Sequence, residues 1–69
     1  MDTTELTTRF TFHPAVDGQG EKYDSIRANA GALASFIVSI TPESREQSLA
    51  ITAIEEAVFW ANAAIARRS

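Results

Sequence analysis

Apolar residues recur every three or four positions through residues 21–40, and this spacing constrains the fold more than any other feature of the chain. A 3-4 repeat places side chains along one side of an α-helix, as in coiled coils. Thr41-Pro42 is then typical of a helix start, with a threonine N-cap and proline at the first helical position. The pattern predicts helices over about 21–40 and 42–67, and so short a break between them predicts an antiparallel hairpin. The repeat consists of Tyr23, Ile26, Ala30, Leu33, Ile37 and Ile40.

The predicted second helix carries more apolar surface than one partner helix can cover. Asn62 is the only polar residue between Ala57 and Ala66, and a helix that is apolar on most sides is buried on most sides. The chain has only 69 residues and no cysteine, so assembly is the remaining common way to stabilise so small a core. We therefore predict a helical homo-oligomer whose interface includes Val58, Phe59, Trp60, Ala61 and Ala64.

The residues before the hairpin show no helical pattern. Residues 1–8 are polar, with four threonines, and we expect this N-terminus to be disordered. Over residues 9–13 the apolar residues alternate, which puts Phe10 and Phe12 on one side of a short extended segment. Residues 17–20 are typical of a turn. The expected fold class is all-α: a single helical-hairpin domain over residues 9–69 with a short extended N-terminal segment.

Charge and composition disfavour several classes of function. Nine acidic against six basic residues give a net charge of −3, which argues against binding to DNA or RNA polymers. The chain has no run of about 18 apolar residues, and its N-terminus is acidic and polar, so we expect neither a membrane span nor a secretory signal. We therefore expect a cytoplasmic protein. The lack of cysteine in the sequence excludes disulfide scaffolds, cysteine zinc sites and thiol catalysis.

No residue pattern points to catalysis. His13 is the only histidine, and a lone histidine beside a proline is more typical of a hydrogen-bonding group than of a general base. Glu55 and Glu56 are adjacent on a helix, so they point about 100° apart and do not form an acid–base pair. We expect a protein that is not an enzyme and that uses no metal and no cofactor.

Binding is the remaining class of function. Phe10 and Phe12 lie between Arg9 and His13, and Arg27 follows in the first turns of the predicted helix. An aromatic face beside a cation is the minimal equipment for a nucleotide, because the ring stacks on a base and the cation pairs with a phosphate. The residues alone leave an alternative open, in which both phenylalanines pack onto the hairpin and Arg27 is solvated.

Two stretches of the chain carry a family resemblance. The sequence SREQSLAITAIEEAVFWANAAIAR, residues 44–67, resembles the helical hairpin shared by phage anti-CBASS cyclic-nucleotide sponges and anti-Thoeris sponges. The sequence RFTFHPAVDGQGEKYDSIRANAGALASFI, residues 9–37, is similar to the compact anti-CBASS type. The resemblance implies a non-enzymatic protein that forms multimers, typically hexamers, and sequesters nucleotide second messengers in pockets between subunits.

The same resemblance implies ligand-binding residues. Phe12 matches the position of the base-stacking aromatic residue and Arg27 that of the basic ligand contact, with His13 and Arg9 beside the aromatic position. Asn29 is a candidate for a second type of pocket, which in these families takes cyclic trinucleotides. The expected ligands are therefore cyclic dinucleotides and cyclic trinucleotides. The alternatives are a sponge for an ADP-ribose-derived Thoeris signal, or a plain oligomerisation or adaptor module without a ligand.

Overall fold

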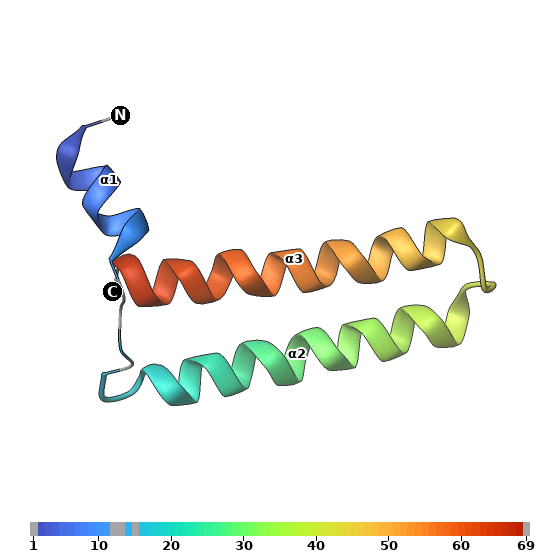
Figure 1. Ribbon diagram of the computed structural model, residues 1–69. Helices are drawn as coiled ribbons and strands as arrows, with labels where there is room; N and C mark the ends of the chain where they lie inside the picture. The colour runs from blue at the N-terminus through green and yellow to red at the C-terminus, as the bar shows by residue number, and fades with distance from the viewer. Residues whose placement is uncertain (1, 12–13, 15, 69) are drawn as a thin grey trace.

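The computed structural model describes residues 2–11, 14 and 16–68, and their regular structure consists of three helices. These are α1 (Thr3–Phe10), α2 (Gln19–Ile40) and α3 (Arg45–Arg68). Helices α2 and α3 run antiparallel beside each other, and α1 lies at the open end of this pair, next to the C-terminus of α3 (Figure 1). No strand occurs in the described ranges. The all-α class and the antiparallel hairpin are therefore confirmed.

The turn between the long helices differs from its prediction by a few residues. Thr41 ends α2 instead of starting α3: its N–H donates to the Ile37 carbonyl at 3.0 Å, and its hydroxyl donates to the same oxygen at 2.7 Å. Ser44 is the actual N-cap of α3, because its Oγ accepts the Gln47 N–H at 3.1 Å. The predicted start at residue 42 was wrong because a threonine hydroxyl can satisfy the last carbonyls of one helix as well as the first amides of the next.

The N-terminal prediction was also wrong, since residues 3–10 form helix α1. The Asp2 side chain caps this helix by accepting the Glu5 N–H at 2.7 Å. Glu5 and Arg9 then pair at 3.1 Å across one turn of the helix. Arg9 and Phe10 are therefore helical, and extended backbone begins only at Thr11. The α1 sequence is mostly polar, and its two large apolar residues, Leu6 and Phe10, are too few to reveal a period. The cap and the ion pair favour the helix.

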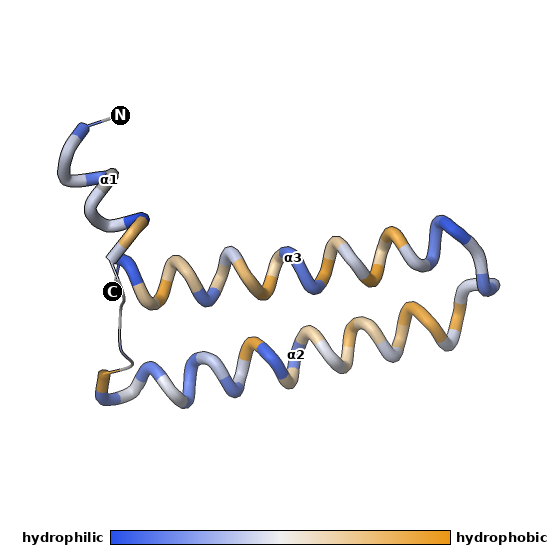
Figure 2. The backbone as a smooth tube through the Cα atoms, in the orientation of Figure 1, coloured by the Kyte–Doolittle hydropathy of each residue, from blue (hydrophilic) through white to orange (hydrophobic). Residues whose placement is uncertain are grey.

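The hairpin has no fully buried apolar side chain among the residues whose burial is described. Apolar residues follow both helices along their length (Figure 2), yet Phe59 and Trp60 keep 66% and 65% of their surface exposed. The radius of gyration is 15.2 Å, against about 11 Å expected for a compact domain of this length. A single chain therefore leaves much of its apolar surface exposed, as the excess of apolar residues in the sequence predicted, and the homo-oligomer stays a prediction.

Helix α3 has the length and apolar composition of a membrane span. An 18-residue window of it has a mean hydropathy of 1.4, and none of the window is buried in this chain. Glu55 and Glu56 lie near the middle of the helix, where a charged side chain costs roughly 3 kcal/mol in lipid. Contacts with other protein helices would cover the same apolar side chains without that cost. The expectation that no segment spans a membrane stays a prediction.

Candidate functional site

The open end of the hairpin contains a cavity of about 530 Å³. Helix α2 contributes Tyr23 and Arg27, which lie one turn apart on the same side of the helix. The last turns of α3 form the opposite wall, because an antiparallel hairpin brings the start of one helix next to the end of the other. The residues lining the cavity are Thr11, Tyr23, Arg27, Asn62, Ala63, Ala66 and Arg67.

Two arginines give this cavity a positive charge, and no carboxylate is among the residues that line it. Arg27 pairs with Asp24 at 3.2 Å, but both side chains are about three-quarters exposed, so the pair holds the guanidinium weakly. Arg67 approaches from α3 and donates one hydrogen bond to the Arg9 carbonyl at 3.3 Å. A guanidinium presents five donors in a planar fork, so most of the donors of both arginines remain for a ligand. The cavity is therefore suited to an anion.

Two further side chains give the cavity the means to recognise a flat, polar ring. Tyr23 is half-buried and offers an aromatic face beside Arg27. Asn62 is half-buried, and its Oδ1 is buried without a hydrogen-bond partner among the described residues. A buried acceptor without a donor is costly, and such groups in native structures frequently mark a function. An aromatic face, an amide and two guanidinium groups together match the base and phosphate of a nucleotide.

Gln19 joins the two walls behind this cavity. It is 5% exposed and is the one buried residue among those whose burial is described. Its Oε1 accepts the Val16 N–H at 3.0 Å, and its Nε2 donates to the Ile65 carbonyl at 3.0 Å. Gly18 precedes it with a φ of 86°, a left-handed conformation that favours glycine. The start of α2 is thereby held against the end of α3.

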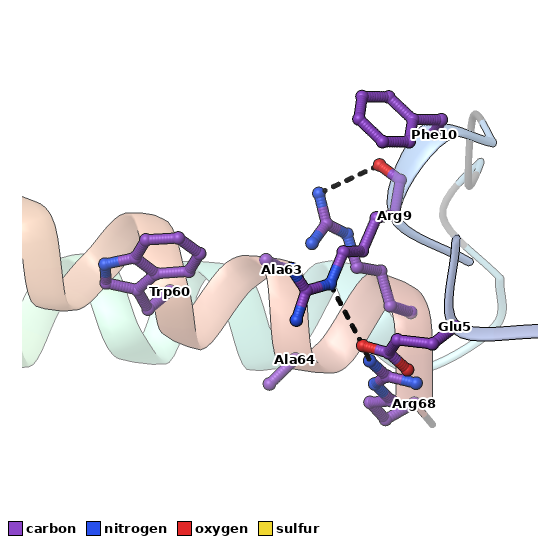
Figure 3. A pocket seen from close by; sticks show the side chains of 8 residues that line it. Glu5, Arg9, Phe10, Trp60, Ala63, Ala64 and Arg68 are labelled. Atoms are coloured by element: carbon purple, nitrogen blue, oxygen red, sulfur yellow. Dashed lines mark hydrogen bonds and ion pairs between the residues drawn. The ribbon is translucent and has the colours of Figure 1, made fainter. Parts of the chain in front are cut away.

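A second cavity, of about 470 Å³, lies between α1 and the last turns of α3 (Figure 3). Glu5 accepts hydrogen bonds from Arg68 at 2.5 Å and from Arg9 at 3.1 Å. The bond from Arg68, and after it the bond from Arg9, lowers the pKa of the Glu5 carboxyl below its ordinary value. Phe10 and Trp60 also line this cavity and are 83% and 65% exposed. Glu5 pairs here with Arg9 and Arg68, so most of the charged groups already have partners within the chain. We therefore regard this cavity as the place where α1 docks against α3.

The predicted ligand residues are not brought together in one place. Arg27 lines the open-end cavity, whereas Arg9 pairs with Glu5 in the second cavity. Asn29 donates to the Ser25 carbonyl at 2.8 Å and lines a separate, mostly apolar hollow of about 280 Å³ between α2 and α3. Phe12 and His13 lie outside the described residues. The ligand-binding roles of these five residues stay predictions.

Three residues of the open-end cavity escaped the sequence analysis. Tyr23 was placed in the helix seam because it fits the 3-4 repeat, and Asn62 and Arg67 were not considered as ligand contacts. A signal for them existed: a hairpin that turns near residue 42 places position 23 across from about position 62. Pairing positions across the turn would therefore have joined Tyr23 and Arg27 with the polar residues near the end of α3.

The predicted interface residues divide into two groups. Phe59, Trp60 and Ala64 are exposed. Val58 and Ala61 are half-buried and line hollows that they share with α2 residues, so they lie toward the hairpin seam. Their role between subunits stays a prediction. Among the described residues, no group of three histidine or carboxylate side chains gathers as a metal site.

These features define the class of the protein: an antiparallel helical hairpin with a basic, aromatic cavity at its open end. The family model described as Acb2/Tad1, hairpin domain, matches residues 2–66, and the chain belongs to this family of anti-CBASS and anti-Thoeris sponges. Membership implies a sponge-type anti-defence role, in a family known for binding rather than catalysis. Comparisons with curated proteins and with solved structures gave no match.

Proposed function

We propose that this protein binds cyclic oligonucleotide second messengers and holds them without cleaving them. The free signal then falls, and CBASS-type immunity is not triggered in the cytoplasm of the host bacterium. One observation carries the proposal beyond family membership: Arg27, Arg67, Tyr23 and Asn62 converge on one cavity. That set supplies phosphate-pairing, stacking and amide groups, which a cyclic dinucleotide requires.

Each group in the cavity has a distinct task. The guanidinium groups of Arg27 and Arg67 each take a phosphate oxygen pair through two parallel N–H donors. Tyr23 supports a base by stacking, and the Asn62 amide meets polar atoms of the ligand. Phe12 and His13 belong to the connection between α1 and α2, which starts at Thr11 on the wall of the cavity. We propose that Phe12 stacks on a base as the family resemblance implies.

Neighbouring subunits are part of this proposal. The hairpin leaves large apolar side chains exposed, and the cavity at its end is open to solvent. Assembly into a homo-oligomer, expected to be a hexamer, would cover the apolar surface and close the cavity with residues of an adjacent copy. Trp60 and Phe59 are the contacts we expect between subunits.

Two other ligand assignments compete with this one. The family includes anti-Thoeris sponges, so an ADP-ribose-derived signal is the second candidate within the same role. A module that oligomerises and binds no small ligand is the third possibility. Calorimetry against cyclic dinucleotides, cyclic trinucleotides and a cyclised ADP-ribose separates all three, because each assignment predicts a different set of binding ligands.

Arg27 is the residue on which the proposal is tested. The variant Arg27→Ala removes a charge-assisted contact worth about 1.5–3 kcal/mol, or roughly 10- to 150-fold in affinity. The salt dependence of binding should also become shallower, because fewer counterions are released. Arg45→Ala is the matched control, since Arg45 begins α3 at the far end of the hairpin. Bound nucleotide should be recovered intact after the complex is denatured.

Two results would contradict the proposal. Equal affinities for the wild type, Arg27→Ala and Arg67→Ala would show that the phosphate of the ligand does not bind in this cavity. Recovery of hydrolysed nucleotide in stoichiometric or greater yield would show that the protein is a phosphodiesterase and not a sponge.

A further inference from the structure

The connection between α1 and α2 is attached at both of its ends to the last turns of α3. At its first end, Arg67 donates to the Arg9 carbonyl at 3.3 Å. At its second end, the Gln19 side chain bonds the backbone of Val16 and the backbone of Ile65. Ile65 lies 46 residues further along the chain than Gln19. The segment from Thr11 to Gly18 is therefore bracketed by bonds to a helix that is remote in sequence.

Gln19 makes the second attachment with both ends of a buried amide. Its Oε1 accepts a backbone N–H and its Nε2 donates to a backbone carbonyl. Ile65 is among the last four residues of α3, so this bond joins the start of α2 to the last turn of α3. A side chain that lacked either the donor or the acceptor would lose one of these two bonds, at a point where the Gln19 side chain itself is buried.

The position of Gln19 connects this bond to the proposed ligand cavity. Gln19 lies one helical turn before Tyr23 and two turns before Arg27 on α2. Ile65 lies between Asn62 and Arg67 on α3. The bond from Gln19 to Ile65 therefore fixes the distance between the two helix ends that carry the walls of the cavity.

We propose that Gln19 is a positioning residue for ligand binding. It sets the spacing between the Tyr23–Arg27 wall and the Asn62–Arg67 wall. This inference rests on the proposed function, because it assigns Gln19 a role in the affinity for the nucleotide and not only in the stability of the fold.

Gln47 provides a matched control at the opposite end of the hairpin. Its Nε2 donates to the Thr41 carbonyl at 3.1 Å and to the Thr41 hydroxyl at 3.0 Å. It is therefore a second glutamine that fastens a helix end, although it is half-buried where Gln19 is buried, and it is not among the residues that line the cavity. Replacing it should lower the melting temperature without changing the geometry of the cavity.

The experiment compares Gln19→Met with Gln47→Met in the full-length protein. Melting temperatures are measured first, and calorimetry with cyclic di-AMP follows well below the lower of them. We expect both variants to have lower melting temperatures, and only Gln19→Met to bind the nucleotide more weakly. The expected loss is roughly tenfold or more in affinity, the effect of losing one charge-assisted contact between a displaced cavity wall and the ligand. Unchanged affinity in Gln19→Met, or an equal loss in Gln47→Met, would overturn the positioning role.

A second variant keeps the test decisive if Gln19→Met fails to fold. A protonated Gln19→Glu side chain has a C=O acceptor and an O–H donor in the layout of the amide, whereas the carboxylate has no donor. The ratio of the Gln19→Glu dissociation constant to the wild-type value should fall toward one as the pH drops from about 7.5 to about 4, through the usual glutamate pKa. A ratio that does not change with pH would contradict the inference.

The proposed function fails in a different way. If the wild type binds neither cyclic di-AMP nor any other cyclic oligonucleotide, both proposals are overturned. If the wild type binds and Gln19→Met binds equally well, only the role of Gln19 is lost.

Discussion

Asn62 combines a cost to the free protein with a use in the proposed complex. Its Oδ1 is buried and has no hydrogen-bond partner among the described residues, yet the residue lines the cavity with Tyr23 and Arg67. A polar group in this position lowers stability unless something else bonds to it. The ligand is the natural partner, since no described side chain supplies the donor.

The variant Asn62→Leu tests this trade between stability and binding. Removing the unpaired acceptor should raise the free energy of unfolding of the free protein by about 1–3 kcal/mol, and it should weaken nucleotide binding. Denaturant titration and calorimetry measure the two effects. Ser39→Leu is the control, because Ser39 is exposed and bonds within its own helix. A variant that is destabilised and binds normally would show that the Asn62 amide serves the fold.

Individual site residues were only partly predictable from the sequence. Arg27 was found because a cation early in the helix follows an aromatic segment. Tyr23 was predicted in the helix seam and not in a site, because the 3-4 repeat describes which side of a helix a residue lies on and not whether a neighbour covers it there. Gln19 was missed entirely, since its value depends on the Ile65 carbonyl, a contact across the chain that no local pattern encodes.

Helix α1 is held to the end of α3 by a contact that depends on pH. The hydrogen bond from Arg68 lowers the pKa of the Glu5 carboxyl. A lowered pKa means that the folded state favours the ionised form, so this contribution is present above the ordinary pKa of 4.5 and is lost as the pH falls through the lower folded value. Arg9 faces the same carboxylate from within α1.

We therefore expect α1 to be docked at pH 7 and released in acid. Amide hydrogen exchange of residues 5–10 should be slower at pH 7, relative to intrinsic rates, than near pH 3. Glu5→Gln should give fast exchange already at pH 7, with little further change on acidification. Equal protection in the wild type and Glu5→Gln at pH 7 would show that the ion pair does not hold the helix.

The helices differed in how well their sequences predicted them. The spacing of apolar residues predicted α2 and α3 because each packs one side against the other, and packing selects a period. Helix α1 has only Leu6 and Phe10 at helical spacing, too few to establish a period, and the Asp2 cap and the pairing of Glu5 with Arg9 favour it. The start of α3 was displaced to Arg45 because Thr41 and Ser44 are both competent caps, and only the path of the turn decides between them.

The exposed apolar surface of the hairpin leads to a prediction about assembly. We expect a stable multimer in which Trp60, 65% exposed in one chain, is covered by a neighbour. Truncating a buried tryptophan costs about 3–5 kcal/mol, so Trp60→Ala should dissociate or unfold the protein. Sedimentation velocity of the wild type, Trp60→Ala and the exposed-residue control Arg45→Ala measures this. A folded wild-type monomer at micromolar concentration would contradict the prediction.

The expectation of partners comes from the sequence, but their number does not. The Ala57–Ala66 run contains more apolar surface than one neighbouring helix covers, and the structure leaves Phe59 and Trp60 of that run exposed. The count of subunits depends on the rotation that relates one copy to the next. That rotation is a property of two surfaces in contact, so the expected hexamer comes from the family resemblance alone.

That no apolar side chain is buried among the residues whose burial is described has a consequence for dosage. If the hairpin is ordered only within an assembly, folding and association are a single equilibrium, and the folded fraction depends on how much protein is present. A cell with few copies of the protein would then contain almost no closed pockets. Near the midpoint of the association equilibrium, each increase in expression would add many closed pockets. The capacity to absorb a signal would therefore appear over a narrow range of protein concentration, as a threshold and not in proportion to the number of chains.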